Sequence, residues 1–148
     1  MYKRQLLGGA PEGDAPTPFP NPDPSSDSLV LAARLPFHAM CGHHLLPFFG
    51  RAHVAFLPAD RLIGFGAIAR IVDASARKPT LQEDLAKDVA DALEQALAPK
   101  GVAVLLEGRH LCMEMRGARK QARMETALWR GVFERDEQRR AEFLTRIR

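Results

Sequence analysis

The stretch TLQEDLAKDVADALEQALAPKGVAVLLE, residues 80–107, predicts a helix followed by a buried strand. Its first part has an apolar stripe at helical spacing with acidic side chains on the opposite face, which is typical of an amphipathic helix. The stripe consists of Leu85, Val89, Ala92, Leu93, Ala96 and Leu97. The run Thr80-Leu81-Gln82-Glu83 fits the S/T-x-x-E capping box and predicts the start of this helix. Pro99 and Gly101 end it, and residues 102–107 form a short apolar run that predicts a strand.

Working outward from this stretch, the patterns predict an α+β domain. Residues 29–37 are mostly apolar and residues 50–57 alternate polar with apolar side chains, so both predict strands. Residues 66–77 predict a short helix that ends before Pro79. Residues 109–116 continue the strand at 102–107 or form its partner, and residues 134–148 predict a charged terminal helix. The order of elements predicts an antiparallel sheet with two helices on one face.

The composition is that of one soluble domain preceded by an irregular arm. A chain of 148 residues fits one domain, which we place at residues 29–148. Between residues 8 and 28, nine of 21 residues are proline or glycine, so residues 1–28 are expected to form a flexible arm. We expect no membrane partner, because no apolar run is long enough to span a bilayer. The N-terminus lacks the apolar core of a secretory signal, so we expect a cytoplasmic protein.

The positive charge is concentrated in the last quarter of the chain. The formal net charge is +3, and residues 109–148 carry eleven basic and six acidic side chains. This favours an anionic ligand. Residues 135–148 interleave acids with arginines, which is typical of a solvated face or a subunit contact, so we expect no nucleic-acid partner.

The densest group of chemically reactive side chains is built around two cysteines. Cys41 and His44 have C-x-x-H spacing, which lets a thiolate and an imidazole on one turn bind the same ion. Cys112 lies 71 positions after Cys41, and in an extended segment its side chain would project to the same side as that of His110. Cys41, His44 and Cys112 would form a Zn²⁺ site with a fourth position open, as catalytic zinc sites have. His43 and His110 would remain beside it as proton carriers.

Simpler interpretations of these residues stay open. Cysteines are readily buried as small hydrophobic side chains, and a second histidine would instead close a structural zinc site. Helix-start chemistry alone explains Glu83, since a glutamate is usual at the N3 position of a capping box, three residues after the N-cap. His38 and His53 are interpreted as strand histidines without a direct chemical role.

The two cysteine motifs and the segment between them resemble one known family. The motifs are CGHHLLPF at residues 41–48 and EGRHLCMEMRG at 107–117, with IGFGAIARIVDASARKPTLQEDLAKDVADAL at 63–93 between them. Together they are similar to GTP cyclohydrolase I over residues 29–143. The resemblance implies the tunnelling fold, assembled as an oligomeric ring. It also implies a zinc-dependent cyclohydrolase that opens the guanine imidazole ring of GTP at C8, releases formate and forms dihydroneopterin triphosphate.

The resemblance also implies roles for particular residues. The zinc ligands of the family correspond to Cys41, His44 and Cys112. Its two unligated histidines correspond to His43 and His110. Its substrate-binding residues correspond to Gln82 and Glu83 for the purine, and to Arg70 and Arg116 for the phosphates. The subunits of the family form a pentamer or decamer in which neighbouring chains share each active site.

One departure from the family pattern leaves the substrate open. Gly66 and Ala67 stand where the family has Ser-Lys, so a lysine expected on the triphosphate is missing. Arg119, Lys120 or Arg123 would have to replace it. The alternative is a divergent enzyme that takes a purine nucleotide or nucleoside with fewer phosphates, or that stops at the ring-opened product. A third interpretation is a non-catalytic purine-binding relative with structural zinc.

Overall fold

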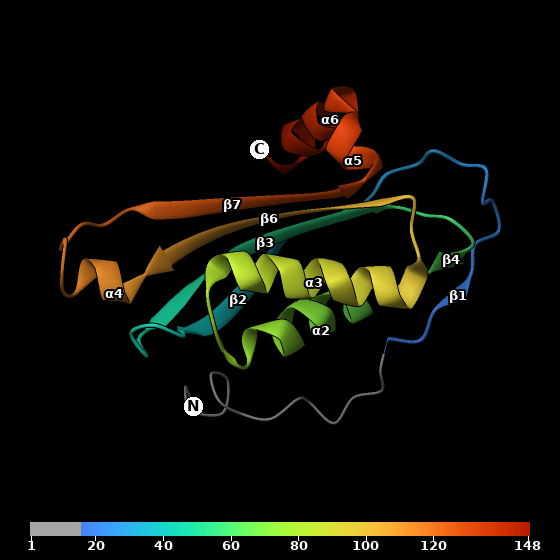
Figure 1. Cartoon of the computed structure of the whole chain (residues 1–148). Coiled ribbons are helices and arrows are strands. Elements are labelled where there is room, and N and C mark those ends of the chain that lie inside the picture. The colour runs from blue at the N-terminus through green and yellow to red at the C-terminus, as the bar shows by residue number, and fades with distance from the viewer. Residues whose placement is uncertain (1–15) are drawn as a thin grey trace.

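A five-stranded sheet with the order β5-β2-β3-β6-β7 organises the part of the chain that the computed structural model describes, residues 16–148 (Figure 1). The four long strands pair antiparallel with their neighbours. They are β2 (Val30–Cys41), β3 (Pro47–Leu57), β6 (Gly101–His110) and β7 (Arg123–Gly131). The short β5 (Pro79–Thr80) pairs parallel with the end of β2. A separate two-stranded ladder joins β1 (Phe19–Pro20) to β4 (Arg61–Leu62).

Two helices cover one face of this sheet, as the sequence predicted. They are α2 (Phe65–Ala76) and α3 (Gln82–Leu97), and both lie on the same side in Figure 1. Their apolar stripes pack on the inward-facing residues of the strands and form the larger core. Its fully buried side chains include Phe37, Phe56, Ile68, Leu85 and Leu93. The expected α+β architecture is therefore confirmed.

Within the described residues, helices cover the opposite face of the sheet at one end. The helices α5 (Val132–Arg135) and α6 (Glu137–Ile147) lie there, away from the short helix α4 (Leu111–Glu114) (Figure 1). Phe133 and Phe143 are fully buried beneath them and pack with Trp129. Asp136 caps α6 by accepting a hydrogen bond from the main-chain N–H of Arg139. The predicted charged terminal helix is confirmed, with an apolar side that holds it on the sheet.

Two local predictions need correction. Residues 109–110 continue the preceding strand as part of β6, as one of the two alternatives had it, but residues 111–114 turn into α4, and the partner strand is β7. The capping box is not made either, because α3 begins after Leu81 and has no side-chain cap. Thr80 is instead held in β5 opposite Cys41, and its hydroxyl donates to the Leu81 carbonyl.

The N-terminal arm falls partly outside the described residues, since these begin at residue 16. Within residues 16–28, Phe19 and Pro20 pair with β4, and Lys100 donates from Nζ to the carbonyls of Pro24 and Ser26. The flexibility of the arm stays a prediction. Among the described helices, none has the length and apolarity needed to cross a bilayer.

Candidate metal centre and active site

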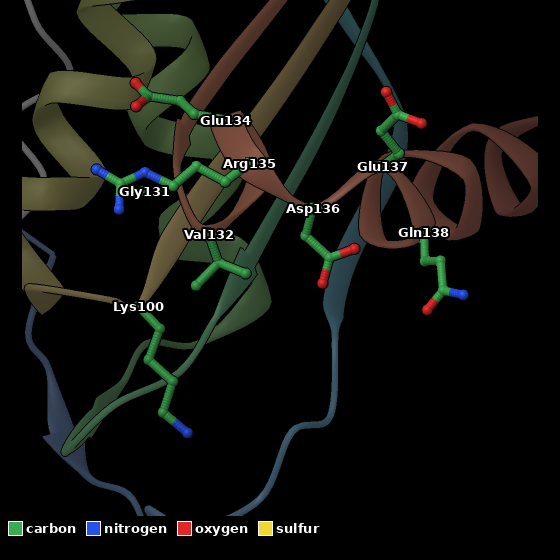
Figure 2. Close-up of a pocket in the computed structure, with 8 residues that line it drawn as sticks. All are labelled: Lys100, Gly131, Val132, Glu134, Arg135, Asp136, Glu137 and Gln138. Atoms are coloured by element: carbon green, nitrogen blue, oxygen red, sulfur yellow. The ribbon is translucent and has the colours of Figure 1, made fainter.

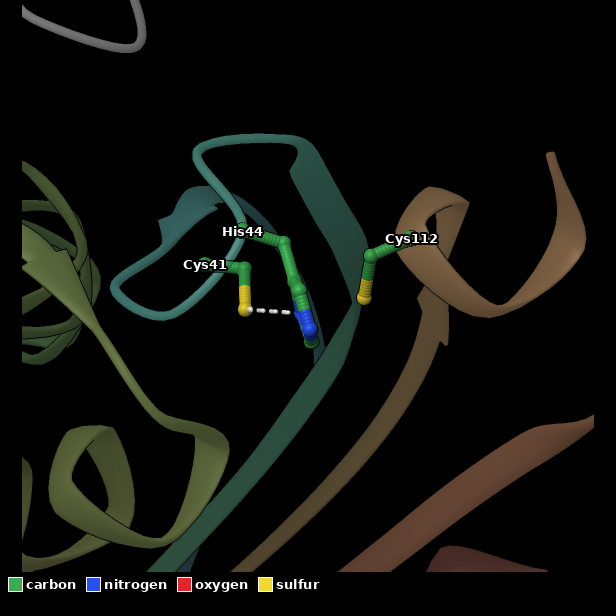
Figure 3. A group of neighbouring side chains, drawn as sticks. All are labelled: Cys41, His44 and Cys112. Atoms are coloured by element: carbon green, nitrogen blue, oxygen red, sulfur yellow. Dashed lines mark hydrogen bonds between the residues drawn. The ribbon is translucent and has the colours of Figure 1, made fainter. Parts of the chain in front are cut away.

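Three predicted metal ligands converge at the end of the sheet where α4 lies. The ligand atoms of Cys41, His44 and Cys112 all lie within 4.8 Å of one another. Figure 3 shows the two sulfur atoms on either side of the His44 imidazole, and Cys41 Sγ lies 3.7 Å from His44 Nδ1. Two thiols and one imidazole at this separation are a donor set that suits zinc. The residues therefore fit a zinc ion.

A tight turn positions the first two of these ligands. Cys41 ends β2, and its main-chain N–H and C=O bond to the Leu46 carbonyl and the Leu45 N–H, both at 2.9 Å. Leu45 has a positive φ of 52°, which closes the turn. The Gly42 N–H donates to the Thr80 carbonyl and ties the turn to β5. The C-x-x-H segment is thus held by main-chain hydrogen bonds on both sides.

Cys112 reaches the cluster from a helical turn. An extended segment was expected here, but Cys112 is the second residue of the helix α4. Burial, and then the neighbouring Cys41 thiol, raise the pKa of the Cys112 thiol. A bound divalent cation would lower the pKa of the thiol, because it stabilises the thiolate. The two cysteines are therefore suited to share one cation.

His110 lies beside this cluster in a fixed orientation. Its ring stacks on Phe48, with centroids 4.7 Å apart and planes 3° apart, and its Nε2 lies 2.9 Å from Gln82 Oε1. Burial lowers the pKa of His110, and the charge of Glu83 partly opposes this effect. The imidazole is therefore neutral at neutral pH.

The buried side chain of Gln82 determines which nitrogen of His110 carries the proton. Gln82 is 1% exposed, and its Nε2 donates to the carbonyls of Leu106 and Met124 and to Thr126 Oγ1, at 3.0–3.2 Å. Carbonyls only accept hydrogen bonds, so the amide oxygen must face His110. His110 Nε2 then donates, which leaves Nδ1 as the basic nitrogen.

The remaining predicted residues are exposed, and of these the structure brings His43 and Arg116 next to His44. His43 is exposed, with its ring centroid 6.0 Å from that of His44. Arg116 donates to the His44 carbonyl at 3.1 Å. Glu83 is exposed at the start of α3. Arg70 is exposed on α2 and lies close to Gly66. A Cβ added at Gly66 would be 3.6 Å from the Arg70 guanidinium.

Two residues near His110 were missed by the sequence argument. Phe48 provides the surface on which the imidazole stacks. Gly108 leaves room for the Gln82 amide, since a Cβ at this position would overlap Gln82 Oε1. The signal was present in the sequence, because an isolated glycine in a strand often marks a close approach of another group.

A pocket elsewhere lacks convergent chemistry. It has a volume of about 810 Å³ and is lined by Lys100 and by residues 131, 132 and 134–138. Figure 2 shows that its charged side chains spread apart instead of pointing toward one centre. The cluster at Cys41 is therefore the better candidate for the functional site.

Comparisons with known proteins agree with this geometry. The family model for GTP cyclohydrolase I matches residues 10–148. GTP cyclohydrolase 1 of Deinococcus radiodurans is 50% identical over 120 residues, which are 80% of this chain and 56% of that protein. GTP cyclohydrolase 1 of Coxiella burnetii is 46% identical over 123 residues, which are 82% of this chain and 67% of that protein.

Two further matches show how much of a longer relative the chain covers and which solved structure shares its fold. The Bifunctional protein FolKE of Lactococcus lactis is 50% identical over 121 residues, which cover 80% of this chain and 35% of that protein. The chain thus spans about half of the Deinococcus protein and a third of the Lactococcus one. The crystal structure of the archaeosine synthase QueF-Like shares the fold, with a TM-score of 0.51, 18% identity and coverage of 70% of this chain and 95% of that chain. The sequence matches and the family model show that this chain belongs to the GTP cyclohydrolase I family.

Proposed function

We propose that the chain is a zinc-dependent cyclohydrolase that opens the imidazole ring of GTP at C8, releases formate and forms dihydroneopterin triphosphate. The observation that carries the proposal is the meeting of Cys41, His44 and Cys112 beside an oriented, neutral His110. A purely structural metal site has no need of an imidazole fixed in one tautomer next to it. Membership of the family supports the same reaction.

Zinc would be held by Cys41 Sγ, Cys112 Sγ and a ring nitrogen of His44. Three protein ligands are the pattern of catalytic zinc sites, whereas structural sites use four. When bound, zinc supplies Lewis acidity for hydrolysis at neutral pH.

The proton transfers would be made by two imidazoles of this chain. His110 Nδ1 is free to accept a proton because Nε2 donates to Gln82. The accompanying positive charge would be stabilised by the nearby carboxylate of Glu83, which partly offsets the burial that lowers the pKa of His110. His43 is exposed at the rim of the cluster and would donate a proton to the nitrogen that leaves C8.

The guanine base would bind at the start of α3. The exposed carboxylate of Glu83 would accept hydrogen bonds from the guanine N–H groups. Gln82 would contact the purine only by exchanging one of its present partners, so its main contribution is to hold His110. Arg70 and Arg116 would bind the phosphates.

A second candidate substrate has fewer phosphates, and two observations favour it. Ala67, at the position where the family has lysine, is 4% exposed and packs in the core. Arg123, one possible replacement, forms an ion pair with Glu107 at 3.1 Å. Arg119 and Lys120 are exposed in the turn after α4 and are the remaining candidates for the missing contact.

The same proposal includes a homo-oligomeric ring, a pentamer or decamer, in the cytoplasm. β7 is an edge strand of nine residues, and an open edge of this length is a template for pairing with another chain. Glu83, Arg70 and His43 are all exposed, so a neighbouring subunit can close the site over the substrate. The two free cysteines support a reducing compartment.

Substitution of the two histidines tests the proposed mechanism. His43→Asn and His110→Asn should retain zinc, measured by mass spectrometry of the metal, and should retain the folded circular dichroism spectrum. Formate release should fall by roughly 10²–10⁴-fold, the usual contribution of a general acid or base. The matched control is His38→Asn, since His38 is an exposed strand histidine stacked on Phe49. Turnover that survives both substitutions would contradict the mechanism.

A further inference from the structure

Among residues 16–148, no helix covers the face of the sheet opposite α2 and α3 at the end away from α5 and α6, and this surface carries charged side chains. Arg51 of β3 lies opposite Glu107 of β6, and Glu107 lies opposite Glu125 of β7. His53, two residues beyond Arg51, projects to the same face because side chains alternate along a strand. This surface is separate from the zinc-ligand cluster, since His110 is on the α3 face with Gln82.

A pocket of about 300 Å³ opens on this face. Its lining includes six polar residues: Arg34, Arg51, His53, Glu107, Arg123 and Arg148. Four of these are arginines and one is a carboxylate. The lining is therefore strongly positive and consists mostly of hydrogen-bond donors.

A buried histidine at this pocket has an unused donor. His53 is 2% exposed, and its Nδ1 accepts the main-chain N–H of Arg34 at 3.4 Å. The proton of the neutral ring is then on Nε2, which is buried and has no hydrogen-bond partner in the described structure. Glu107 Oε2 is 3.7 Å from Nε2, which is too long for a hydrogen bond. Such an orphaned buried donor calls for a partner.

Protonation of His53, which would strengthen its attraction to Glu107, is disfavoured. Burial lowers the pKa of His53, and Arg34 and Arg51 lower it further against the opposing effect of Glu107. Glu107 is itself engaged by Arg123 at 3.1 Å. At neutral pH the ring therefore presents a neutral N–H beside positively charged neighbours.

Two arginines are free to complete an anion site. Arg51 is exposed and makes no ion pair within residues 16–148. Arg34 occupies a β-bulge of β2 with a positive φ of 60°, and bulges commonly re-aim a side chain at a functional site. Within residues 16–148 its guanidinium donates one hydrogen bond, to the main-chain oxygen of Arg148 at 3.3 Å, so it retains further donors.

We propose that Arg34, Arg51 and the Nε2–H of His53 form a second ligand site, on the sheet face opposite α2 and α3, that binds a phosphate group. Phosphate oxygens accept hydrogen bonds from guanidinium groups in bidentate geometry, and they satisfy the buried imidazole N–H at the same time. The phosphate is either free inorganic phosphate or the monoester of a small metabolite. The site is independent of the proposed cyclohydrolase reaction.

Chemical protection of arginines locates such a site directly. The zinc-loaded full chain is treated with phenylglyoxal, which modifies exposed arginines, and peptide mass spectrometry measures the rate at each one. Inorganic phosphate and ribose 5-phosphate are added in separate titrations. The proposal predicts saturable protection of Arg34 and Arg51 by at least one of them. The exposed Arg61 of β4 should show no protection and serves as the internal control.

Variants then test whether the protected arginines act together. Arg51→Gln should weaken the protection of Arg34 by about tenfold, as expected for the loss of one charge-assisted hydrogen bond. His53→Phe should weaken it as well, because it removes the buried donor. Equal protection of Arg34, Arg51 and Arg61 would indicate ionic screening alone and overturn the proposal. Absence of protection, or protection unchanged in Arg51→Gln, would overturn it too.

Discussion

Replacement of Gln82 by methionine separates a positioning role from direct substrate binding. The change conserves side-chain volume but removes the amide that lies 2.9 Å from His110 Nε2. His110 then loses the partner that fixes its tautomer, while its stacking on Phe48 remains. We expect kcat to fall by about 10–100-fold, part of the roughly 10²–10⁴-fold that a general base contributes. KM should change little, and zinc content should not change.

The same substitution has a predictable effect on stability. It leaves the buried carbonyl of Leu106, and the partly exposed carbonyl of Met124, without the donor they share. An unsatisfied buried polar group costs about 1–3 kcal/mol, so the free energy of unfolding should fall by about 1–3 kcal/mol. The free energy of unfolding of a domain of this size is roughly 5–15 kcal/mol, so the variant should still fold.

Steady-state kinetics of formate release and urea unfolding measure the two effects in one preparation. The matched control is Gln95→Met on the exposed side of α3, which should change neither quantity. A rise in KM with kcat unchanged would show that Gln82 binds substrate directly. An unchanged kcat and KM, with the expected loss of stability, would refute the claim that Gln82 orients His110.

Three further substitutions test separate parts of the structure. Cys112→Ala should fold, but it should lose zinc to a chelator at a concentration at which the parent chain keeps the metal, because only two ligands remain. Retention of zinc by this variant would contradict the assigned cluster. Gly50→Ala should lower the free energy of unfolding in urea by about 1–3 kcal/mol, because the added Cβ would overlap the Glu107 carbonyl. Gly64→Ala is the control and should leave stability unchanged, because the described part of the chain places nothing within 4 Å of the added Cβ. His53→Gln should flatten the pH dependence of stability. Burial lowers the folded-state pKa of His53 below 6.5, so the unfolded chain binds more protons and the parent loses stability as pH falls through that value. Parallel pH profiles of the free energy of unfolding would contradict this cause.

The sequence was most informative where periodicity and turn residues agree. The stripe on α3 and the alternation in β3 each predicted a buried face, and both helices lie on the predicted side of the sheet. The C-x-x-H spacing predicted that Cys41 and His44 would meet, because such short-range geometry depends on a single turn.

Long-range geometry could not be predicted from the same patterns. The helical turn at Cys112 is only four residues long, and so short an element leaves no periodic signal. β7 was missed because most of its side chains are exposed, so it lacks a buried apolar face. The capping box failed because pairing of Thr80 with Cys41 outweighed a local cap.

The burial of Gln82 shows the same limit at the site itself. A glutamine at the start of a helix is expected to be solvated, and its partners in β6 and β7 are 24–44 positions away along the chain. Only the pairing of those strands creates the row of acceptors that holds the amide. The positioning contact to His110 therefore became visible only in three dimensions.

Turnover of defined substrates by the zinc-loaded protein shows whether the cluster catalyses the proposed reaction. GTP, GMP and guanosine are incubated in parallel, and formate and the pterin product are followed together by mass spectrometry. The account predicts formate and dihydroneopterin triphosphate in equal amounts from GTP. Formate from GMP or guanosine instead, or a ring-opened product without pterin, would favour the alternative substrate. Absence of formate from all three would contradict the proposed function.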